Sequence, residues 1–190
     1  MAYLTSKQLK EMGFKSLGKN VKISDKASIY NTNQIEIGNN SRIDDFCVLS
    51  GKIKIGDFCH VATMCLIAGG DKGIYISDFC GLAYGVKVFS QSDDYSGEAM
   101  VSPLIPEKYT KVTKDKVVLH RQVIIGAGSI VMPGVNIAEG CSVGAMSLVH
   151  KDTQPWGIYL GVPAKRVKER KKDLLVLEQK FLKELQNDSF

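Results

Sequence analysis

The chain has 190 residues, of which 44% are hydrophobic and 24% charged, the proportions of one ordinary folded domain. Much of its formal net charge of +5 lies in one basic run near the C-terminus. No aromatic residues interleave with that run, so nucleic-acid binding is not expected. No stretch has signal-peptide character or approaches about 18 continuous apolar residues, so we expect a cytoplasmic protein without membrane insertion.

Residues 1–20 predict a short helical segment ahead of the main fold. Thr5 or Ser6 can cap a helix that Gly13 ends, because a hydroxyl accepts from free backbone N–H groups and glycine stops a helix easily. Imperfect six-residue units follow from Ile23, so the main fold is expected to begin near residue 21.

A six-residue repeat dominates residues 21–162. Such a period is neither the alternation of a free strand nor the 3.6 of a helix, but it suits a short strand and a tight turn. Three units close one triangular coil, and successive coils stack as parallel strands about 4.8 Å apart. The chain is therefore predicted to be all-β, a left-handed parallel β-helix with aliphatic residues inside. The clear units begin at Ile37, Ile43, Leu49, Ile55, Val61, Ile67, Ile76, Leu82, Val88, Leu119, Ile125, Val131, Ile137, Val143 and Val149.

All five cysteines occupy the fifth position of a unit, a column that otherwise holds mostly small residues. Their odd number and the lack of zinc-type spacing favour reduced thiols. We interpret them as small buried hydrophobic residues rather than as redox or metal groups. They are Cys47, Cys59, Cys65, Cys80 and Cys141.

The register is interrupted at 69–75 and by a longer excursion at 90–118. A β-helix has no cleft of its own, so its function is expected where the register breaks. The excursion opens with Asp93 and Asp94, at the point where the chain leaves the rigid frame. These two acids are candidate catalytic groups, although a merely solvated loop is the alternative.

The three histidines are His60, His120 and His150. Any of them can act as a general base near neutral pH, or can be a plain surface residue. We prefer His60 and His120. A metal hydratase on the same prism would need imidazoles converging on zinc, but these residues are 60 and 30 positions apart and form no H-x4-H pair. No metal is therefore expected.

Residues 163–190 combine the basic run with a predicted amphipathic helix. The run reads KRVKERKK and indicates a local anion site. The helix either caps the last coil or packs on a neighbouring subunit. Its apolar face is formed by Leu174, Leu177, Phe181, Leu182 and Leu185.

Several motifs resemble the hexapeptide-repeat acetyltransferases, over about residues 21–170. The repeats from Ile125 to Val149 are followed by PWGIY and GVPAKR. GVPAKRV is typical of sugar-type members such as the galactoside acetyltransferases. The SQSDDYSG loop and PWGIY are similar to enzymes of O-antigen clusters, in particular the acyltransferases of nucleotide-linked 4-amino-4,6-dideoxyglucose.

The resemblance implies a homotrimer in which acetyl-CoA and the acceptor meet between adjacent subunits. It places coenzyme contacts at Ala127, Ala145, His150, Lys165 and Lys168. Small residues let the pantetheine lie along the backbone, and the lysines can neutralise phosphates. In the loop that carries the acids, acceptor contacts are predicted at Ser90, Gln91 and Tyr95.

Asp93 stands where the galactoside enzymes carry a catalytic histidine. A hydroxyl acceptor needs a strong base, whereas an amine needs only to arrive neutral. This departure favours N-acetylation of a dTDP-linked 4-amino-4,6-dideoxy sugar, with Asp93 or Asp94 holding the amine and His60 or His120 accepting its proton. The alternatives are an O-acetyltransferase of the galactoside or maltose type, a γ-carbonic-anhydrase-like hydratase, and a non-catalytic β-helix.

Overall fold

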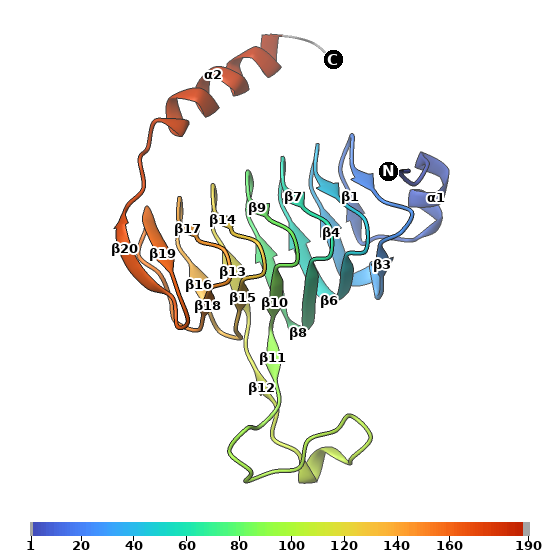
Figure 1. Cartoon of the computed structure of the whole chain (residues 1–190). Coiled ribbons are helices and arrows are strands. Elements are labelled where there is room, and N and C mark those ends of the chain that lie inside the picture. Colours follow the sequence, from blue (N-terminus) through green and yellow to red (C-terminus); the bar gives the residue numbers. More distant parts are fainter. Residues whose placement is uncertain (1, 188–190) are drawn as a thin grey trace.

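The computed structural model describes residues 2–187, which form a three-sided prism of stacked strands (Figure 1). An arm projects from one corner of the prism, and a C-terminal helix runs along another. The predicted left-handed parallel β-helix is confirmed, since every strand pair in the prism is parallel until the final strand, β20. Residue 1 and residues 188–190 of the predicted end segments lie outside the described residues.

Face one of the prism is an eight-stranded sheet. Seven of its strands come from successive coils, and the eighth folds back antiparallel at the C-terminal end. In chain order they are β2 (Lys22–Ile23), β5 (Arg42–Ile43), β7 (His60–Val61), β9 (Gly81–Leu82), β14 (Ile124–Ile125), β17 (Ser142–Val143), β19 (Gly157–Leu160) and β20 (Lys165–Glu169).

Faces two and three share one ten-stranded sheet, because β6 and β8 continue around the corner between them. Face two contains β3 (Ser28–Ile29), the first halves of β6 (Val48–Ile55) and β8 (Leu66–Ile76), β10 (Lys87–Phe89), β15 (Ile130–Val131) and β18 (Leu148–Val149). Face three contains β1 (Ser16–Leu17), β4 (Ile35–Ile37), the second halves of β6 and β8, β13 (Val117–Leu119) and β16 (Asn136–Ile137).

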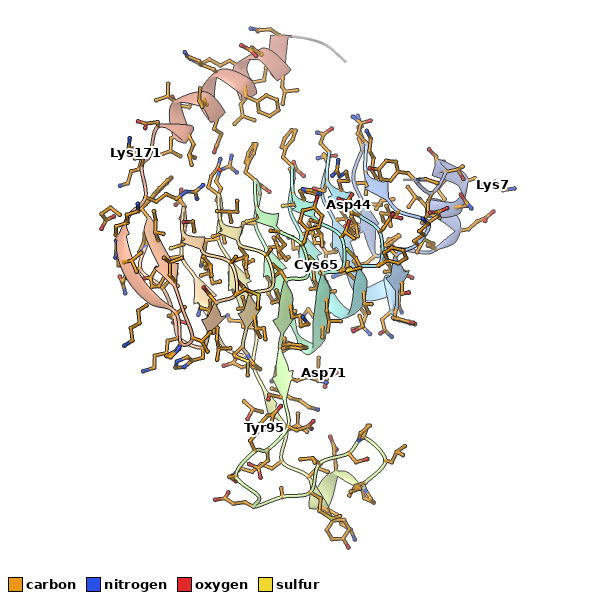
Figure 2. The ribbon with its side chains drawn as sticks, viewed as in Figure 1. Lys7, Asp44, Cys65, Asp71, Tyr95 and Lys171 are labelled. Atoms are coloured by element: carbon orange, nitrogen blue, oxygen red, sulfur yellow. The ribbon has the colours of Figure 1, made fainter. Side chains whose placement is uncertain are left out.

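The first residue of each unit fills the interior, as the repeat predicts. Ile43 is 1% exposed and Ile125 is fully buried, while the residue before each of them points outward because side chains alternate along a strand. The five cysteines are unpaired and buried, and Cys65 lies inside the prism in Figure 2. Their thiols donate to backbone carbonyls, as from Cys47 Sγ to the Ala62 oxygen at 3.0 Å. The packing interpretation of the cysteines is confirmed.

Two positions of the turn have different steric demands. At the second position the next coil approaches so closely that a Cβ on Gly126 would lie 2.4 Å from the Ala145 nitrogen. At the fourth position the backbone takes a positive φ, which is uncommon for residues other than glycine. Non-glycine residues occupy many of these positions nonetheless, among them Asn20, Asn40, Phe46, Phe58, Met64, Phe79, Gln122, Met146 and Trp156.

Both ends of the stack are covered by the chain itself. The predicted N-terminal helix is α1 (Ser6–Glu11), and Thr5 caps it in a reciprocal box with Gln8. β1 pairs with β4 and so already belongs to the prism, ahead of the start expected near residue 21. At the other end the β19–β20 hairpin closes the last coil. The division of the chain into three parts stays a prediction.

The second helix, α2 (Leu174–Asn187), packs along the corner between faces three and one of its own chain, not on the end coil. We call this the covered corner; its turns hold Phe58, Phe79, Gln122 and Trp156. The Phe181 ring lies 5.2 Å from Phe58 and 6.3 Å from Phe79. The predicted placement of the helix on the last coil is therefore wrong, while its packing on a neighbouring subunit stays a prediction.

The long excursion forms the arm, between faces two and three. Its base is an antiparallel pair, β11 (Gln91–Ser92) and β12 (Thr113–Lys114), and the arm contains a short 3-10 turn, η2 (Glu107–Tyr109). Another such turn, η1 (Thr32–Gln34), precedes β4. The interruption at 69–75 is part of β8 and lies beside the arm's base, where Lys114 pairs with Asp71 at 3.3 Å. The two breaks in the register therefore meet in one place.

Candidate active site

His60 stands on face one within a cluster of charged groups. Val61 points into the core, so the preceding imidazole faces outward. Its Nε2 lies 2.7 Å from Oδ2 of Asp44, whose side chain is only 4% exposed. Arg42, one coil away on β5, approaches the same carboxylate with Nε at 2.9 Å from Oδ1 and Nη2 at 3.0 Å from Oδ2. The hydrogen bond from Arg42 to Asp44 raises the pKa of the guanidinium.

Beside His60 lies a hollow of about 190 Å³. It exists because small residues follow the strands on two neighbouring coils, leaving space between larger side chains. Tyr84 borders it and is 67% exposed. The remaining lining residues are Ala62, Gly81, Leu82, Ala83 and Ile124.

The hollow adjoins the corner between faces one and two. We call this the open corner; its turns hold Phe46, Met64, Tyr84, Ala127 and Met146. Backbone hydrogen bonds connect these turns from coil to coil, as from Gly128 to the Tyr84 oxygen at 2.9 Å and from Met146 to the Ala127 oxygen at 2.8 Å. No element of the described chain covers this corner in the way that α2 covers the other.

Two predicted coenzyme residues, Ala127 and Ala145, occupy successive turns of the open corner. The next coil in the same direction ends at Leu160, whose side chain covers Gly144, and Lys165 lies opposite Leu160 in the terminal hairpin. From Tyr84 to this hairpin is three coils, about 14 Å along the axis. We call this line of positions, from Tyr84 through Ala127 and Ala145 to the terminal hairpin, the coenzyme row. Its length and direction suit an extended ligand that lies parallel to the prism axis.

The basic run divides into two kinds of residue. Arg166 pairs with Glu169, and Arg170 donates to the carbonyls of Gln122 at 2.7 Å and Gly140 at 3.0 Å. Desolvation in this place lowers the pKa of Arg170. Lys165 and Lys168 are exposed on β20; Lys165 lies opposite Leu160 next to the open corner, and Lys168 lies opposite Ile158 on face one. Among the described residues neither of these two lysines is held in an ion pair, so both remain available to an anion.

The remaining predicted coenzyme residue, His150, lies elsewhere. It follows β18 at the end of face two, so one whole face separates it from Ala127 and Ala145. Its side chain is exposed. Within a single chain, His150 is therefore not close to the other four residues that were predicted to contact the coenzyme.

The predicted arm residues differ in their surroundings. Ser90 is 1% exposed and donates to the Ala68 carbonyl at 3.1 Å, and the Gln91 side chain packs against Gly70. Asp93 is exposed and Tyr95 is 89% exposed. Ser90 thus anchors the arm in the prism, while Asp93 and Tyr95 present their side chains at its surface.

Asp94 is engaged within the arm. It accepts from the Ser96 hydroxyl at 2.8 Å, from the Ser96 backbone at 3.1 Å and from the Ala99 backbone at 3.1 Å. These bonds to the charged form, above all that from the Ser96 hydroxyl, lower the pKa of Asp94 to about 2. Of the two candidate acids, Asp93 is the one left for a ligand.

The candidate groups of one chain do not form a single site. Figure 2 shows Asp44, the partner of His60, on the prism and Tyr95 on the arm, away from the prism. His120 lies at the start of a covered-corner turn, just before Arg121, which binds Glu178 of α2. His60, His120 and the arm acids thus occupy three regions.

The sequence reasoning missed Asp44 and Arg42. Their signal was present: Arg42 and His60 are 18 residues apart, three units, and so stand on one face in successive coils. Asp44 is a charged residue in a column of the repeat where glycine, alanine and serine predominate.

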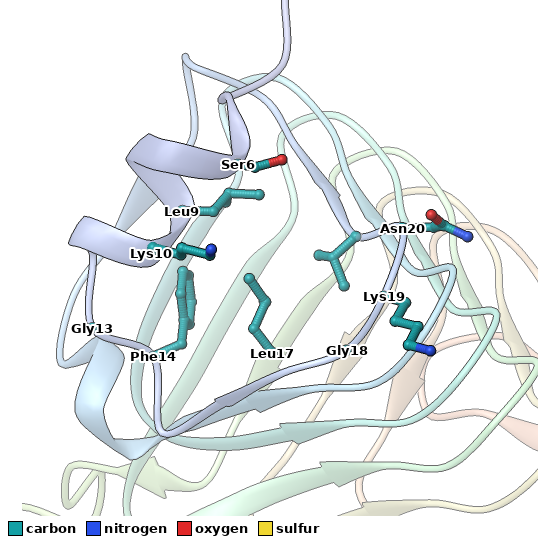
Figure 3. A pocket seen from close by; sticks show the side chains of 10 residues that line it. Ser6, Leu9, Lys10, Gly13, Phe14, Leu17, Gly18, Lys19 and Asn20 are labelled. Atoms are coloured by element: carbon teal, nitrogen blue, oxygen red, sulfur yellow. The ribbon is translucent and has the colours of Figure 1, made fainter.

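Another hollow, of about 640 Å³, lies between α1 and the first coil (Figure 3). Leu9, Phe14 and Leu17 form its apolar side, and Lys10 and Lys19 lie at its rim. It is at the N-terminal end of the prism, whereas the coenzyme row is at the other end.

Within residues 2–187, no three His, Cys, Asp or Glu side chains gather closely enough to hold a metal. No helix of that range has the length and apolar character needed to cross a membrane.

Comparison with known proteins gives a consistent picture. No family model matches the chain. A dTDP-4-amino-4,6-dideoxy-D-glucose acyltransferase of Escherichia coli is 48% identical over 184 residues, covering 95% of each chain. A putative lipopolysaccharide biosynthesis O-acetyl transferase, WbbJ of Escherichia coli K12, is 28% identical over 63% of this chain and 59% of its own.

Solved structures agree with the curated relatives. AntD, an N-acyltransferase from Bacillus cereus in complex with dTDP and 3-hydroxybutyryl-CoA, superposes with a TM-score of 0.95 at 48% identity, covering 97% of this chain and 98% of AntD. An AntD variant in complex with dTDP-4-amino-4,6-dideoxyglucose and coenzyme A gives the same TM-score at 49% identity, over 96% and 98%.

Proposed function

Since the chain belongs to the dTDP-4-amino-4,6-dideoxyglucose acyltransferases of the hexapeptide-repeat class, we propose that it transfers acetyl from acetyl-CoA to a sugar's amino group. The acceptor is a dTDP-linked 4-amino-4,6-dideoxy sugar, and the product serves surface polysaccharide synthesis. The protein carries out this transfer in the cytoplasm. The observation that carries this proposal is 48% identity over 95% of both chains. The buried unpaired cysteines fit a reducing compartment.

Acyl transfer to an amine needs a neutral nucleophile beside the thioester. The amine nitrogen attacks the carbonyl carbon, a C–N bond forms, the C–S bond breaks and coenzyme A leaves as its thiolate. The proton lost by the nitrogen passes to a base and then to that thiolate. Positioning is the first task of the protein, because a well-aligned pair of reactants reacts far faster than a free one.

Asp93 holds the acceptor amine in this proposal. Its carboxylate is exposed on the arm, while its neighbour Asp94 already accepts three hydrogen bonds. A carboxylate can orient an amino group by charge and hydrogen bonding. Tyr95 and Gln91 lie beside it as acceptor contacts, and Ser90 fixes the base of the arm.

His60 accepts the amine's proton. It borders the hollow at the open corner, one coil from the turn that begins the coenzyme row. His120 lies at the covered corner, away from that row, so we assign it no part in the transfer.

The coenzyme lies along the open corner. Ala127 and Ala145 leave the backbone accessible to the pantetheine, and Lys165 and Lys168 bind the phosphates at the hairpin end. The thioester then points toward His60. His150 contacts the coenzyme only from a neighbouring chain, because a full face separates it from this row.

Two features support a homotrimer with sites between subunits. Asp93 and His60 lie in different regions of one chain, so a shared site requires two chains. The open corner also exposes a row of large apolar side chains, which is unusual for a surface without a partner. Their exposed fractions are 54% for Phe46, 63% for Met64, 67% for Tyr84 and 72% for Met146.

The proposal is tested by thiol release from acetyl-CoA with two matched acceptors. With dTDP-4-amino-4,6-dideoxyglucose we expect release and an acetylated product by mass spectrometry. With dTDP-6-deoxyglucose, which carries a hydroxyl in place of the amine, no release is expected. Equal rates with both would favour the O-acetyltransferase alternative, whose support is the likeness to WbbJ. Running 3-hydroxybutyryl-CoA, the donor bound to AntD, in parallel identifies the preferred acyl group.

A further inference from the structure

The environment of Asp44 is unusual for a surface coil. The residue is 3% exposed and ionisable, whereas the other buried polar residues of the described chain are serines and a threonine. A buried carboxylate is costly unless it is paired and hydrogen-bonded. Arg42 supplies the charge, and the remaining hydrogen-bonding partner is the His60 ring at 2.7 Å.

The contact determines which nitrogen of His60 bears a proton. An ionised carboxylate can only accept, so Nε2 must donate to Oδ2. Arg42 Nη2 also lies 2.9 Å from Nε2. Both nitrogens donate to Oδ2 of Asp44, so they are close because they share this acceptor and not because they bond to each other. In the neutral ring the lone pair is therefore on Nδ1.

We infer that Asp44 is a positioning residue for the acyl transfer, which holds His60 with Nε2 protonated and Nδ1 as the basic nitrogen. The inference rests on the proposed function, in which His60 takes the proton from the attacking amine. As the C–N bond forms, that proton moves to Nδ1. The departing thiolate of coenzyme A then receives it, which restores the neutral ring.

The geometry also explains why Asp44 is buried while His60 is half-exposed. The carboxylate orients the ring from behind, and the ring borders the hollow in front. Within the described residues Oδ1 of Asp44 is buried and makes no hydrogen bond, although it lies 2.9 Å from Arg42 Nε. The carboxylate is thus committed to His60 and Arg42 alone.

The tautomer can be observed without measuring activity. Ring ¹⁵N spectra of the protein labelled at its three histidines are recorded at pH of about 9, where an ordinary imidazole is neutral. The signals of His60 are identified by their loss in His60→Gln. We expect the wild-type ring to be protonated on Nε2 and Asp44→Asn to lose this single tautomer. Protonation of the wild-type ring on Nδ1 would overturn the inference.

Kinetics then distinguish a positioning role from a structural one. Asp44→Asn is nearly isosteric and is expected to lower turnover about 100-fold, with the KM for acetyl-CoA changed less than about twofold. In the His60→Gln background the same substitution should lower turnover by less than about twofold, because residues acting as a unit are not additive. Equal losses in both backgrounds would mean that Asp44 acts through something other than His60.

Asp45→Asn is the matched control. Asp45 is in the same turn, but its carboxylate accepts from Ser24 and does not contact His60. The turnover of Asp45→Asn should therefore equal that of the wild type. If the wild-type protein acetylated no amino sugar, the proposed function would fail, while the ¹⁵N spectra would still decide how Asp44 holds the ring.

Discussion

The covered corner and the open corner of the prism are built from the same turn and end in opposite surroundings. At both, the fourth residue of the unit takes a positive φ and often carries a large side chain, such as Phe58 and Phe79 on one and Phe46 and Met64 on the other. On the covered corner the two phenylalanines stack with centroids 5.0 Å apart and receive Phe181 of α2. On the open corner the side chains remain exposed.

The difference shows that the repeat fixes where apolar side chains emerge but not what covers them. One corner is covered within the chain and contributes stability. The other keeps its apolar row, the small residues at Ala127 and Ala145, and the hollow beside His60. The proposed chemistry and the proposed subunit contact therefore lie on the same corner.

Charging the open corner should have the largest effect. Met64→Glu combined with Met146→Glu places two carboxylates in the apolar row, where burial against another chain would leave them unpaired. We expect monomers by light scattering and acetyl transfer below detection. Val176→Glu, on the exposed side of α2, is the control and should remain trimeric. A trimeric, active double variant would remove the open corner as the interface.

Removing the acid on the arm should come next. Asp93→Asn keeps the shape but loses the charge that orients the amine, so turnover should fall about 100-fold. The Kd for coenzyme A, measured by calorimetry, should not change. Unaltered turnover would remove Asp93 from the site.

Coenzyme binding should respond more weakly to the hairpin lysines. Lys165→Ala deletes one exposed charge-assisted contact, so the Kd for coenzyme A should rise about 5- to 10-fold with turnover retained. Lys171→Ala, in the same basic run but outside β20, should bind normally. An effect of Lys165→Ala on turnover alone would contradict its assignment to the phosphates.

Opening the covered corner should change stability and leave chemistry intact. Phe181→Ala removes edge-to-face contacts from a half-exposed ring, which costs about 1 kcal/mol and lowers Tm by about 2–4 °C. Calorimetry measures this, and the acetyl-transfer rate should be unaltered. A loss of activity at the same Tm would indicate that α2 contributes to the site.

The smallest expected effect concerns Asp94. Its pKa is lowered to about 2, so its contribution to holding the arm's turn is present above the ordinary Asp range near pH 4 and is lost as pH falls through about 2. The Ser96 and Ala99 amide resonances should shift across that window and should not in Asp94→Asn. A transition near pH 4 instead would show that the Ser96 contacts are not maintained.

The regular part of the fold was predictable because one period dictates it. The aliphatic column, the cysteine column and the two breaks in the register follow from spacing alone. The location of α2 did not follow, since an apolar stripe identifies a face of a helix and not its partner. Phe and Met at positive φ were equally unforeseen, because local preference disfavours them and only stacking between coils maintains them.

The candidate site was less accessible for a related reason. His60 and Asp93 can be selected by their chemistry, but Asp44 becomes visible only when units 18 residues apart are recognised as neighbours on face one. The wide separation of His60 from the arm depends on the three-dimensional path of the chain. It implies a second subunit that one sequence does not display.

Complementation between two defective chains tests most directly whether the site lies between subunits. His60→Gln and Asp93→Asn are coexpressed with different tags, and mixed oligomers are isolated by purification on both tags. If one chain supplies His60 and its neighbour supplies Asp93, every mixed trimer has one intact site in three, and the purified mixture should recover about one third of wild-type acetyl transfer. Activity no higher than that of either variant alone would contradict a site shared between chains.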